Sequence, residues 1–188
     1  LAGMALSAVC GAFSSFIVYF ANNKEGMQTI AYWMMGSLAG AQWGELAVIA
    51  PIIMASILFF WTQSRVLNLM LLGDESAITM GTDLHAYRQW YLLISSLIVG
   101  FAVYSAGMIG FVGLIVPHVI RMFTGPDHKR LLPVAALVGA IFLVVADGLC
   151  RVIIPHTELP IGILISMIGA PSFIYLMIKK TYGFGGSD

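Results

Sequence analysis

Charged residues are scarce in this sequence. Only 10% of its 188 residues are charged and 60% are hydrophobic, whereas a soluble globular domain carries roughly 25% charged and 45–50% apolar residues. Nine Lys and Arg are balanced by nine Asp and Glu, so the chain lacks the basic field that attracts nucleic acid. With a mean hydropathy of +0.93, it has more apolar surface than one core can bury. We predict a polytopic all-α membrane protein that lipid covers.

The sequence also lacks the motifs of several kinds of site. Its two cysteines, Cys10 and Cys150, form no C-x-x-C pair, and its four histidines are dispersed without metal-ligand spacing, which argues against a zinc site. It has no G-x-x-x-x-G-K-[ST] loop to cradle a nucleotide's phosphates. No Ser–His or paired-Asp constellation lies within the apolar segments. We therefore expect no metal, no bound cofactor and no catalytic residue in this chain.

The first residues do not have the features of a signal peptide. The chain begins at Leu1 without an initiator Met, a basic segment or a small-residue cleavage site. We expect a further part of the protein to precede it.

Six apolar segments are suited to crossing a bilayer, whose core of ~30 Å needs about 20 helical residues. They cover residues 1–20, 46–64, 90–106, 107–122, 133–154 and 160–178. The third and fourth form one unbroken run, which as a single helix would reach about 50 Å at ~1.5 Å per residue. We therefore expect a break near Gly107 and Gly110, although one long helix would also be compatible with the charge distribution.

The basic residues set the expected orientation, because Lys and Arg accumulate in cytoplasmic loops. Six crossings place seven of the nine basic residues inside, and only Lys24 and Arg151 outside. The inner set consists of Arg65, Arg88, Arg121, Lys129, Arg130, Lys179 and Lys180. The protein is thus expected to be a multi-pass protein of the cytoplasmic membrane.

The segment 27–44 is only half apolar, rich in Trp and Tyr, and interrupted by three glycines. This composition favours an external interfacial helix over 27–44. The alternative is a seventh crossing, which would invert the first span relative to the rest.

Small residues recur at every fourth position in the first and last spans, a spacing that lets helix backbones approach closely in lipid. The positions are Gly3, Ser7, Gly11 and Ser15, and then Gly162, Ser166 and Ala170, followed by the helix-kinking Pro171. Tight packing alone would account for both series. The alternative is that the two helices line a pathway or a subunit seam.

A pair of opposite charges lies within the fifth span. Asp147 and Arg151 are four residues apart with the acid first, the favourable order for an ion pair on a helix. One interpretation is a self-neutralising pair. The other is that Arg151, near the outer surface, offers its guanidinium to an acidic group of an external partner.

The segment 72–81, on the expected inner side, is too long for a turn. Acidic Asp74 and Glu75 suit the positive end of a short helix, and Gly81 would end it. Such a helix could be an ordinary loop element. It is also what a membrane subunit needs if a soluble motor is to push on it.

Several motifs in one order resemble the FecCD-type, vitamin B12 permease-like membrane subunits of bacterial ABC importers. The resemblance extends over nearly the whole chain, and it suggests the last six of about ten crossings. The motifs are YWMMGS (32–37), Glu75-x-Ala77-x-x-x-Gly81, GFVGLIVPH (110–118), GPDHKRLLP (125–133), Ala146-Asp147, Arg151, ELPIG (158–162) and GAP (169–171).

This resemblance implies a single permease domain over 1–188, with a cytoplasmic coupling loop over 73–88 that docks on a separate ATPase subunit, where ATP is bound. The coupling residues would be Gly73, Asp74, Glu75, Ala77 and Gly81. Arg151 and Lys24 would meet an extracytoplasmic substrate-binding protein. The first and last spans would border the two-fold axis of a permease dimer.

The function that the resemblance implies is import of an iron–siderophore, haem or cobalamin by alternating access. The rival is half of an ion-coupled secondary transporter, which needs an ionisable residue facing a cavity near the midplane. Asp147 is the only deep carboxylate, and Arg151 lies one turn away. The ABC importer is therefore the preferred prediction.

Overall fold

The computed structural model describes residues 2–20, 24–81, 83–153 and 159–183, and within these ranges every regular element is an α-helix. The all-α expectation is therefore confirmed. In chain order the helices are α1 (Ala2–Phe20), α2 (Lys24–Met35), α3 (Trp43–Thr62), α4 (Ser64–Leu71), α5 (Asp74–Thr79), α6 (Leu84–Ala106), α7 (Val112–Thr124), α8 (His128–Ile153) and α9 (Ile161–Gly183).

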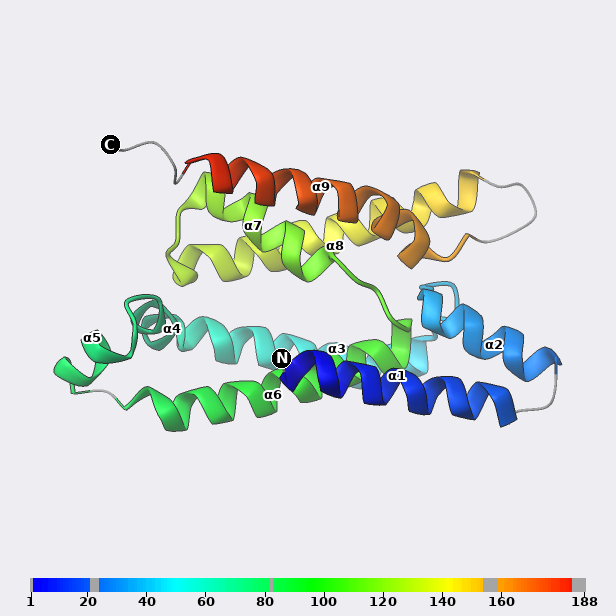
Figure 1. The fold of residues 1–188 in the computed structure, drawn as a ribbon, viewed down its shortest axis with the longest axis horizontal. Coiled ribbons are helices and arrows are strands. Elements are labelled where there is room, and N and C mark those ends of the chain that lie inside the picture. The colour runs from blue at the N-terminus through cyan, green and yellow to red at the C-terminus, as the bar shows by residue number, and fades with distance from the viewer. Residues whose placement is uncertain (1, 21–23, 82, 154–158, 184–188) are drawn as a thin grey trace.

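The long helices run side by side along one axis of the molecule (Figure 1). In this view α7, α8 and α9 form one group and α1, α3 and α6 another, and the segment after α6 passes from one group to the other. The short helices α4 and α5 lie at one end of the bundle, together with the turn between α7 and α8. Helix α2 lies at the opposite end.

Each of the six predicted crossings falls on one helix. Four of them, α1, α3, α6 and α8, have the length and hydropathy of membrane spans. The helices α7 and α9 contain the shorter apolar segments Val112–Thr124 and Ile161–Tyr175. Helices α6 and α8 begin five or six residues before the predicted spans, because their first turns are polar and were counted as loop.

The break near Gly107 is present. Helix α6 ends at Ala106, and Gly107 adopts a φ of 70°, a left-handed conformation that strongly favours glycine. A Cβ at Gly107 would also overlap the carbonyl oxygen of Trp33, at the end of α2. The single long helix over 90–122 is therefore excluded.

Two predicted boundaries were wrong. The helix expected over 27–44 is α2, which begins at Lys24 and ends at Met35, because Gly36 turns the chain with a φ of 73°. Its 12 residues span about 18 Å at ~1.5 Å per residue, and unlike α7 it is not among the apolar helices of the described chain, so a seventh crossing here is not supported. The loop expected over 73–88 ends earlier, since α6 begins at Leu84, where Asp83 accepts a hydrogen bond from the backbone of His85.

Helix α8 is the centre of the packing. One buried cluster joins α8 to α9 through Ala146, Cys150, Ile161 and Ile165. A second joins α7 to the first turn of α8 through Val116, Ile120 and Leu131. Helix α8 also packs against α3 and α4. By contrast, no residue of α1 is buried in its candidate span, so its apolar surface is left for lipid or for other protein.

Candidate functional site

The segment expected to couple with an ATPase forms one short helix, α5, and a second short helix, α4, precedes it. Helix α4 follows α3 after Gln63. The exposed Leu72 and then Gly73 connect α4 to α5. The glycines on either side of α5 adopt left-handed conformations, with φ values of 90° for Gly73 and 77° for Gly81. The predicted glycine end of the short helix is thus confirmed, whereas α4 was not predicted.

Helix α5 is anchored on one side and apolar on the other. Ala77 is fully buried, and its backbone N–H donates to the carbonyl of Gly73. Ile78 and Met80 are 69% and 54% exposed. They lie at the end of the bundle, beyond the membrane spans, where lipid would not cover them. Exposed apolar side chains outside the lipid region are typical of a protein interface. The side chains of Asp74 and Glu75 lie outside the described part, so their role stays a prediction.

Helix α4 is held to the turn between α7 and α8 by a side-chain amide. The Nδ2 of Asn68 donates to the Oδ1 of Asp127 at 2.8 Å. The Oδ1 of Asn68 accepts the backbone N–H of His128 at 2.9 Å and lies 2.8 Å from its Nδ1. Because an amide oxygen only accepts, the Nδ1 of His128 carries the proton. We call this arrangement of Asn68, Asp127 and His128 the Asn68 clasp.

Asp127 serves the clasp and the start of α8 at once. Its Oδ1 also accepts the backbone N–H of Lys129 at 3.0 Å, the contact of an N-cap residue. The amide of Asn68, and then the N–H of Lys129, lower the pKa of this carboxyl below its ordinary value of 3.8. One turn earlier than α4, Trp61 donates its Nε1–H to the carbonyl of Lys129 at 3.0 Å.

At the other end of α8, the expected ion pair is present. The Nε of Arg151 donates to the Oδ2 of Asp147 at 2.8 Å. The side chain of Arg151 is 50% exposed and that of Asp147 is 23% exposed. The self-neutralising interpretation therefore holds within the chain, and docking of a partner on the half-exposed Arg151 stays a prediction.

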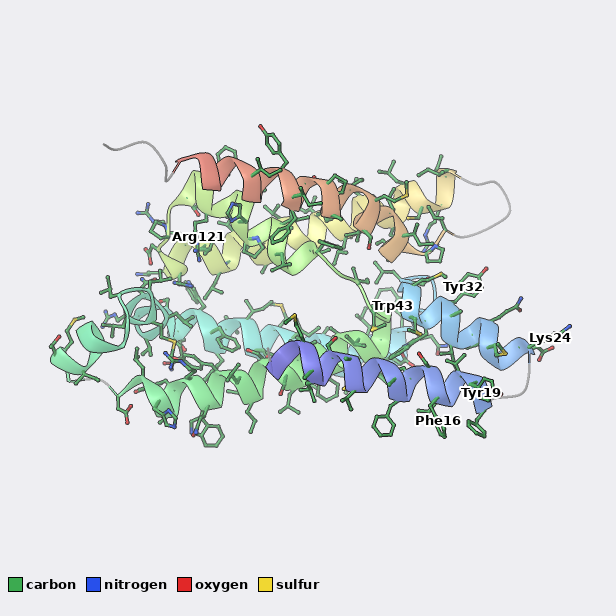
Figure 2. All side chains as sticks on the ribbon, viewed as in Figure 1. Phe16, Tyr19, Lys24, Tyr32, Trp43 and Arg121 are labelled. Atoms are coloured by element: carbon green, nitrogen blue, oxygen red, sulfur yellow. The ribbon has the colours of Figure 1, made fainter. Side chains whose placement is uncertain are left out.

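The basic residues divide between the two ends as the orientation rule requires. Figure 2 shows Lys24 at the end of the molecule where α2 lies, and Arg121 at the opposite end, near α4 and α5. The expected partner of Lys24 stays a prediction. Phe16 and Tyr19 of α1 point away from the other helices in the same view, as expected of side chains that face lipid.

The small-residue series behave differently from each other. In α1, a Cβ at Gly3 or Gly11 would meet nothing within 4 Å, and Ser7 and Ser15 are exposed. In α9, a Cβ at Gly162 would overlap the carbonyl of Met35, so this glycine packs within the chain. The rest of the α9 series, Ser166, Ala170 and Pro171, is exposed or half-buried, and α9 continues through Pro171 to Gly183.

A contact that sequence reasoning missed lies before α7. Phe111 has a φ of 63°, the only non-glycine residue of the described chain with a positive value. A Cβ at Gly169 of α9 would lie 2.7 Å from the Cβ of Phe111. The GFVG and GAP motifs are thus brought together, and only their glycines could have signalled a close approach. Among the described residues, no group of three His, Cys, Asp or Glu could hold a metal ion.

The geometry defines a class of protein. Apolar helices of spanning length form a bundle, short helices project at one end, and an ion pair lies near the other. These are the features of a multi-pass membrane protein. The model of the FecCD transport family matches residues 1–179, and the chain belongs to this family.

The relatives are permease subunits. The chain is 41% identical to the hemin transport system permease protein HmuU of Yersinia pestis, over 96% of this chain and 54% of that protein. It is 41% identical to the cobalamin import system permease protein BtuC of Halobacterium salinarum, over 94% of this chain and 47% of that protein. The chain therefore spans about half the length of the curated relatives it matches.

A solved structure agrees with the fold. It is described as an inward-facing conformation of a metal-chelate type ABC transporter, and it aligns with a TM-score of 0.88 at 34% identity. The alignment covers 94% of this chain and 57% of that chain. The fold class expected from the resemblance is confirmed.

Proposed function

We propose that this chain forms part of the membrane-spanning permease subunit of an ATP-binding-cassette importer in the cytoplasmic membrane. The cargo class is a metal chelate, namely haem, cobalamin or a ferric siderophore. Membership of the FecCD transport family supports this, as do relatives named for hemin and cobalamin transport. The observation that carries the proposal is the pair α4–α5, which projects from the bundle with exposed apolar side chains.

The α4–α5 segment would dock on a separate cytoplasmic ATPase subunit. Leu72, Ile78 and Met80 are exposed there, and burying them against a groove of the ATPase would supply the hydrophobic part of the contact. The flanking glycines Gly73 and Gly81 set the angle at which α5 leaves the bundle. ATP would be bound and hydrolysed on that subunit, and its movement would shift the helices between two arrangements.

The opposite end would receive the substrate-binding protein. Lys24 begins α2 and Arg151 lies in the last turn of α8, and both face the side that the basic residues assign to the exterior. An acidic side chain of the binding protein would bond the half-exposed guanidinium of Arg151, whose Nε donates to Asp147. A second permease copy would pack against the open small-residue flank of α1.

The rival function, half of an ion-coupled secondary transporter, has less support. Such a protein needs an ionisable group available to a cavity near the membrane midplane. Asp147 lies in the outer half of α8 and is paired with Arg151 at 2.8 Å. The family assignment also points away from this class.

Reconstitution tests the proposal. The transporter that contains this chain is placed in proteoliposomes with its ATPase, and the binding protein is loaded with haem, cobalamin or a ferric siderophore. We expect uptake of one of the three that requires ATP and the binding protein. Uptake driven by an ion gradient without ATP would support the secondary transporter and refute the importer.

A further inference from the structure

We propose that helix α8 transmits displacements between the two partner sites, and that Asn68 is the positioning residue that connects the ATPase-docking segment to α8. This inference rests on the proposed function. It adds the route by which the state of one partner reaches the other, and it assigns a role to the Asn68 clasp.

The first step is the contact of α4 with its neighbours. Helix α5, which would touch the ATPase, packs against α4 and α6, and α4 in turn packs against α8. A displacement of α5 thus moves α4, and α4 lies directly on the helix that contains the outer arginine. Helix α4 packs on both α5 and α8.

The second step is the chemistry of the clasp. The amide of Asn68 bonds to the first residue of α8 and to the residue before it. Its Nδ2 donates to Asp127, and its Oδ1 accepts from the backbone N–H and the Nδ1 of His128. Packed apolar side chains can slide over one another, but these bonds have fixed directions and lengths. Asn68 therefore transfers a shift or rotation of α4 to the first turn of α8.

The third step is the rigidity of helix α8. Helix α8 has 26 residues, about 39 Å at ~1.5 Å per residue, which is enough to cross the membrane. Its Pro133, in the second turn, has no N–H to donate to the carbonyl of Lys129, and that carbonyl accepts the Nε1–H of Trp61 instead. Asp147 and Arg151 lie near the far end of the same helix. A tilt or axial shift set at Asp127 and His128 therefore reaches Arg151 without crossing a loop.

The consequence is reciprocal. If α8 links both sites, docking of the loaded binding protein on Arg151 changes the position of α4, and the ATPase changes the affinity at Arg151 by the same coupling free energy. Loss of the clasp should then reduce communication between the partners and leave each partner's own binding in place.

The experiment uses the assembled transporter, with its ATPase, in lipid nanodiscs. ATP hydrolysis is measured with and without the loaded binding protein, together with the affinity of the binding protein for the permease. For Asn68→Ala we expect the stimulation by the binding protein to fall by about fivefold or more, while basal hydrolysis, ATPase association and the affinity of the binding protein for the nucleotide-free transporter stay at wild-type values. Gln89→Ala is the matched control, because it removes a side-chain amide bond to His85 inside α6 alone.

A pair of substitutions that exchanges the side chains of residues 68 and 127 tests the hydrogen bonds themselves. Asn68→Asp sets a carboxylate against Asp127 and should abolish the stimulation. Adding Asp127→Asn restores a donor, so the double variant retains the bonds among residues 68, 127 and 128 with the charge exchanged, while the N–H of Lys129 loses its acceptor at that atom. We expect the double variant to recover the stimulation that Asn68→Asp loses.

Two results would overturn the inference. Undiminished stimulation in Asn68→Ala would show that the partners communicate by another route. A parallel fall in stimulation, basal hydrolysis and ATPase association would show that Asn68 only supports docking. Failure of the proposed function has a different signature, since the wild-type permease would then bind no ATPase and show no stimulation at all.

Discussion

At the scale of single residues, glycine positions decide how closely the helices approach. Gly162 at the start of α9 lies against the carbonyl of Met35, where a Cβ would overlap a backbone atom. A backbone cannot rotate away as a flexible side chain can, so α2 and α9 would have to separate. The sequence predicted a close contact at Gly162 but did not identify α2 as its partner.

We predict that Gly162→Ala destabilises the protein by about 1–3 kcal/mol, the usual cost of overpacking a fitted contact. Thermal unfolding of the purified protein in detergent measures this as a lower Tm. Gly148→Ala in α8 is the control, because its Cβ would meet nothing within 4 Å. Equal Tm values for the two variants would contradict the contact with Met35.

The carboxyl of Asp127 provides a prediction about pH. The amide of Asn68 lowers the pKa of Asp127 below 3.8, so the interaction stabilises the fold above that value and is lost as the pH falls through the lowered pKa. In Asn68→Ala the largest cause of the shift is gone, and we expect the pKa of Asp127 to rise towards 3.8.

Carboxyl carbon NMR of Asp127, labelled in the permease and titrated with acid, measures this pKa in both variants. The remaining bond from the N–H of Lys129 should keep part of the shift. An unchanged midpoint in Asn68→Ala would mean that Asn68 does not hold the carboxylate in solution.

At the scale of elements, most of the fold could be predicted, because hydropathy is a property of long segments. Each of the six apolar segments is a helix, and the break at Gly107 followed from the excessive length of the run 90–122. Helix α4 was missed, since its eight residues directly follow α3 and only Gln63 separates the two. The end of α2 was misplaced because Gly36, rather than Gly40 or Gly44, makes the turn.

The site was predictable only in part. The spacing of Asp147 and Arg151 predicts their ion pair, because residues four apart meet on one helix face. The Asn68 clasp joins residues 59 and 60 positions apart, and nothing local in the sequence connects them. The same holds for Phe111 and Gly169, whose contact depends on how α7 and α9 pack.

The short helix α5 carries a prediction about coupling. Gly81 has a φ of 77°, and a residue with a side chain pays about 1–2 kcal/mol in this conformation. We expect Gly81→Arg to redirect α5 and to uncouple ATP hydrolysis from uptake. Gly81→Asn is the control, because asparagine adopts the left-handed region more readily than other residues with a side chain. Uptake and ATPase association at wild-type levels in Gly81→Arg would argue against the coupling role.

Helix α8 carries the prediction for the outer surface. Arg151→Glu places two carboxylates four residues apart and removes the proposed contact with the binding protein. Because the site is half exposed, we expect a modest loss of affinity, about 1 kcal/mol or roughly fivefold. Asp147→Asn breaks the same ion pair but retains Arg151, and should bind the binding protein normally. Equal losses for the two variants, measured by surface plasmon resonance, would assign the effect to the pair and not to docking.

At the scale of the whole molecule, the described chain leaves one helix largely uncovered. Helix α1 has no buried residue in its span and packs mainly on α2. Its large apolar side chains, Phe13 among them, suit lipid. Its small residues Gly3, Ser7, Gly11 and Ser15 form a smooth strip, which in lipid gains little unless another helix packs on it.

This strip leads to the prediction for assembly. Gly11→Leu fills the strip, and if a second permease copy packs there, we expect the dimer to weaken by about tenfold or more, since overpacking costs about 1–3 kcal/mol. Val9→Leu is the control, because it also enlarges an exposed side chain of α1, but lies about 160° away around the helix. Light scattering of the full-length permease in detergent, over a range of concentrations, measures the dimer. If Gly11→Leu and Val9→Leu dimerise equally well, the strip faces lipid or another part of the same subunit, and the two-fold axis lies along a different helix.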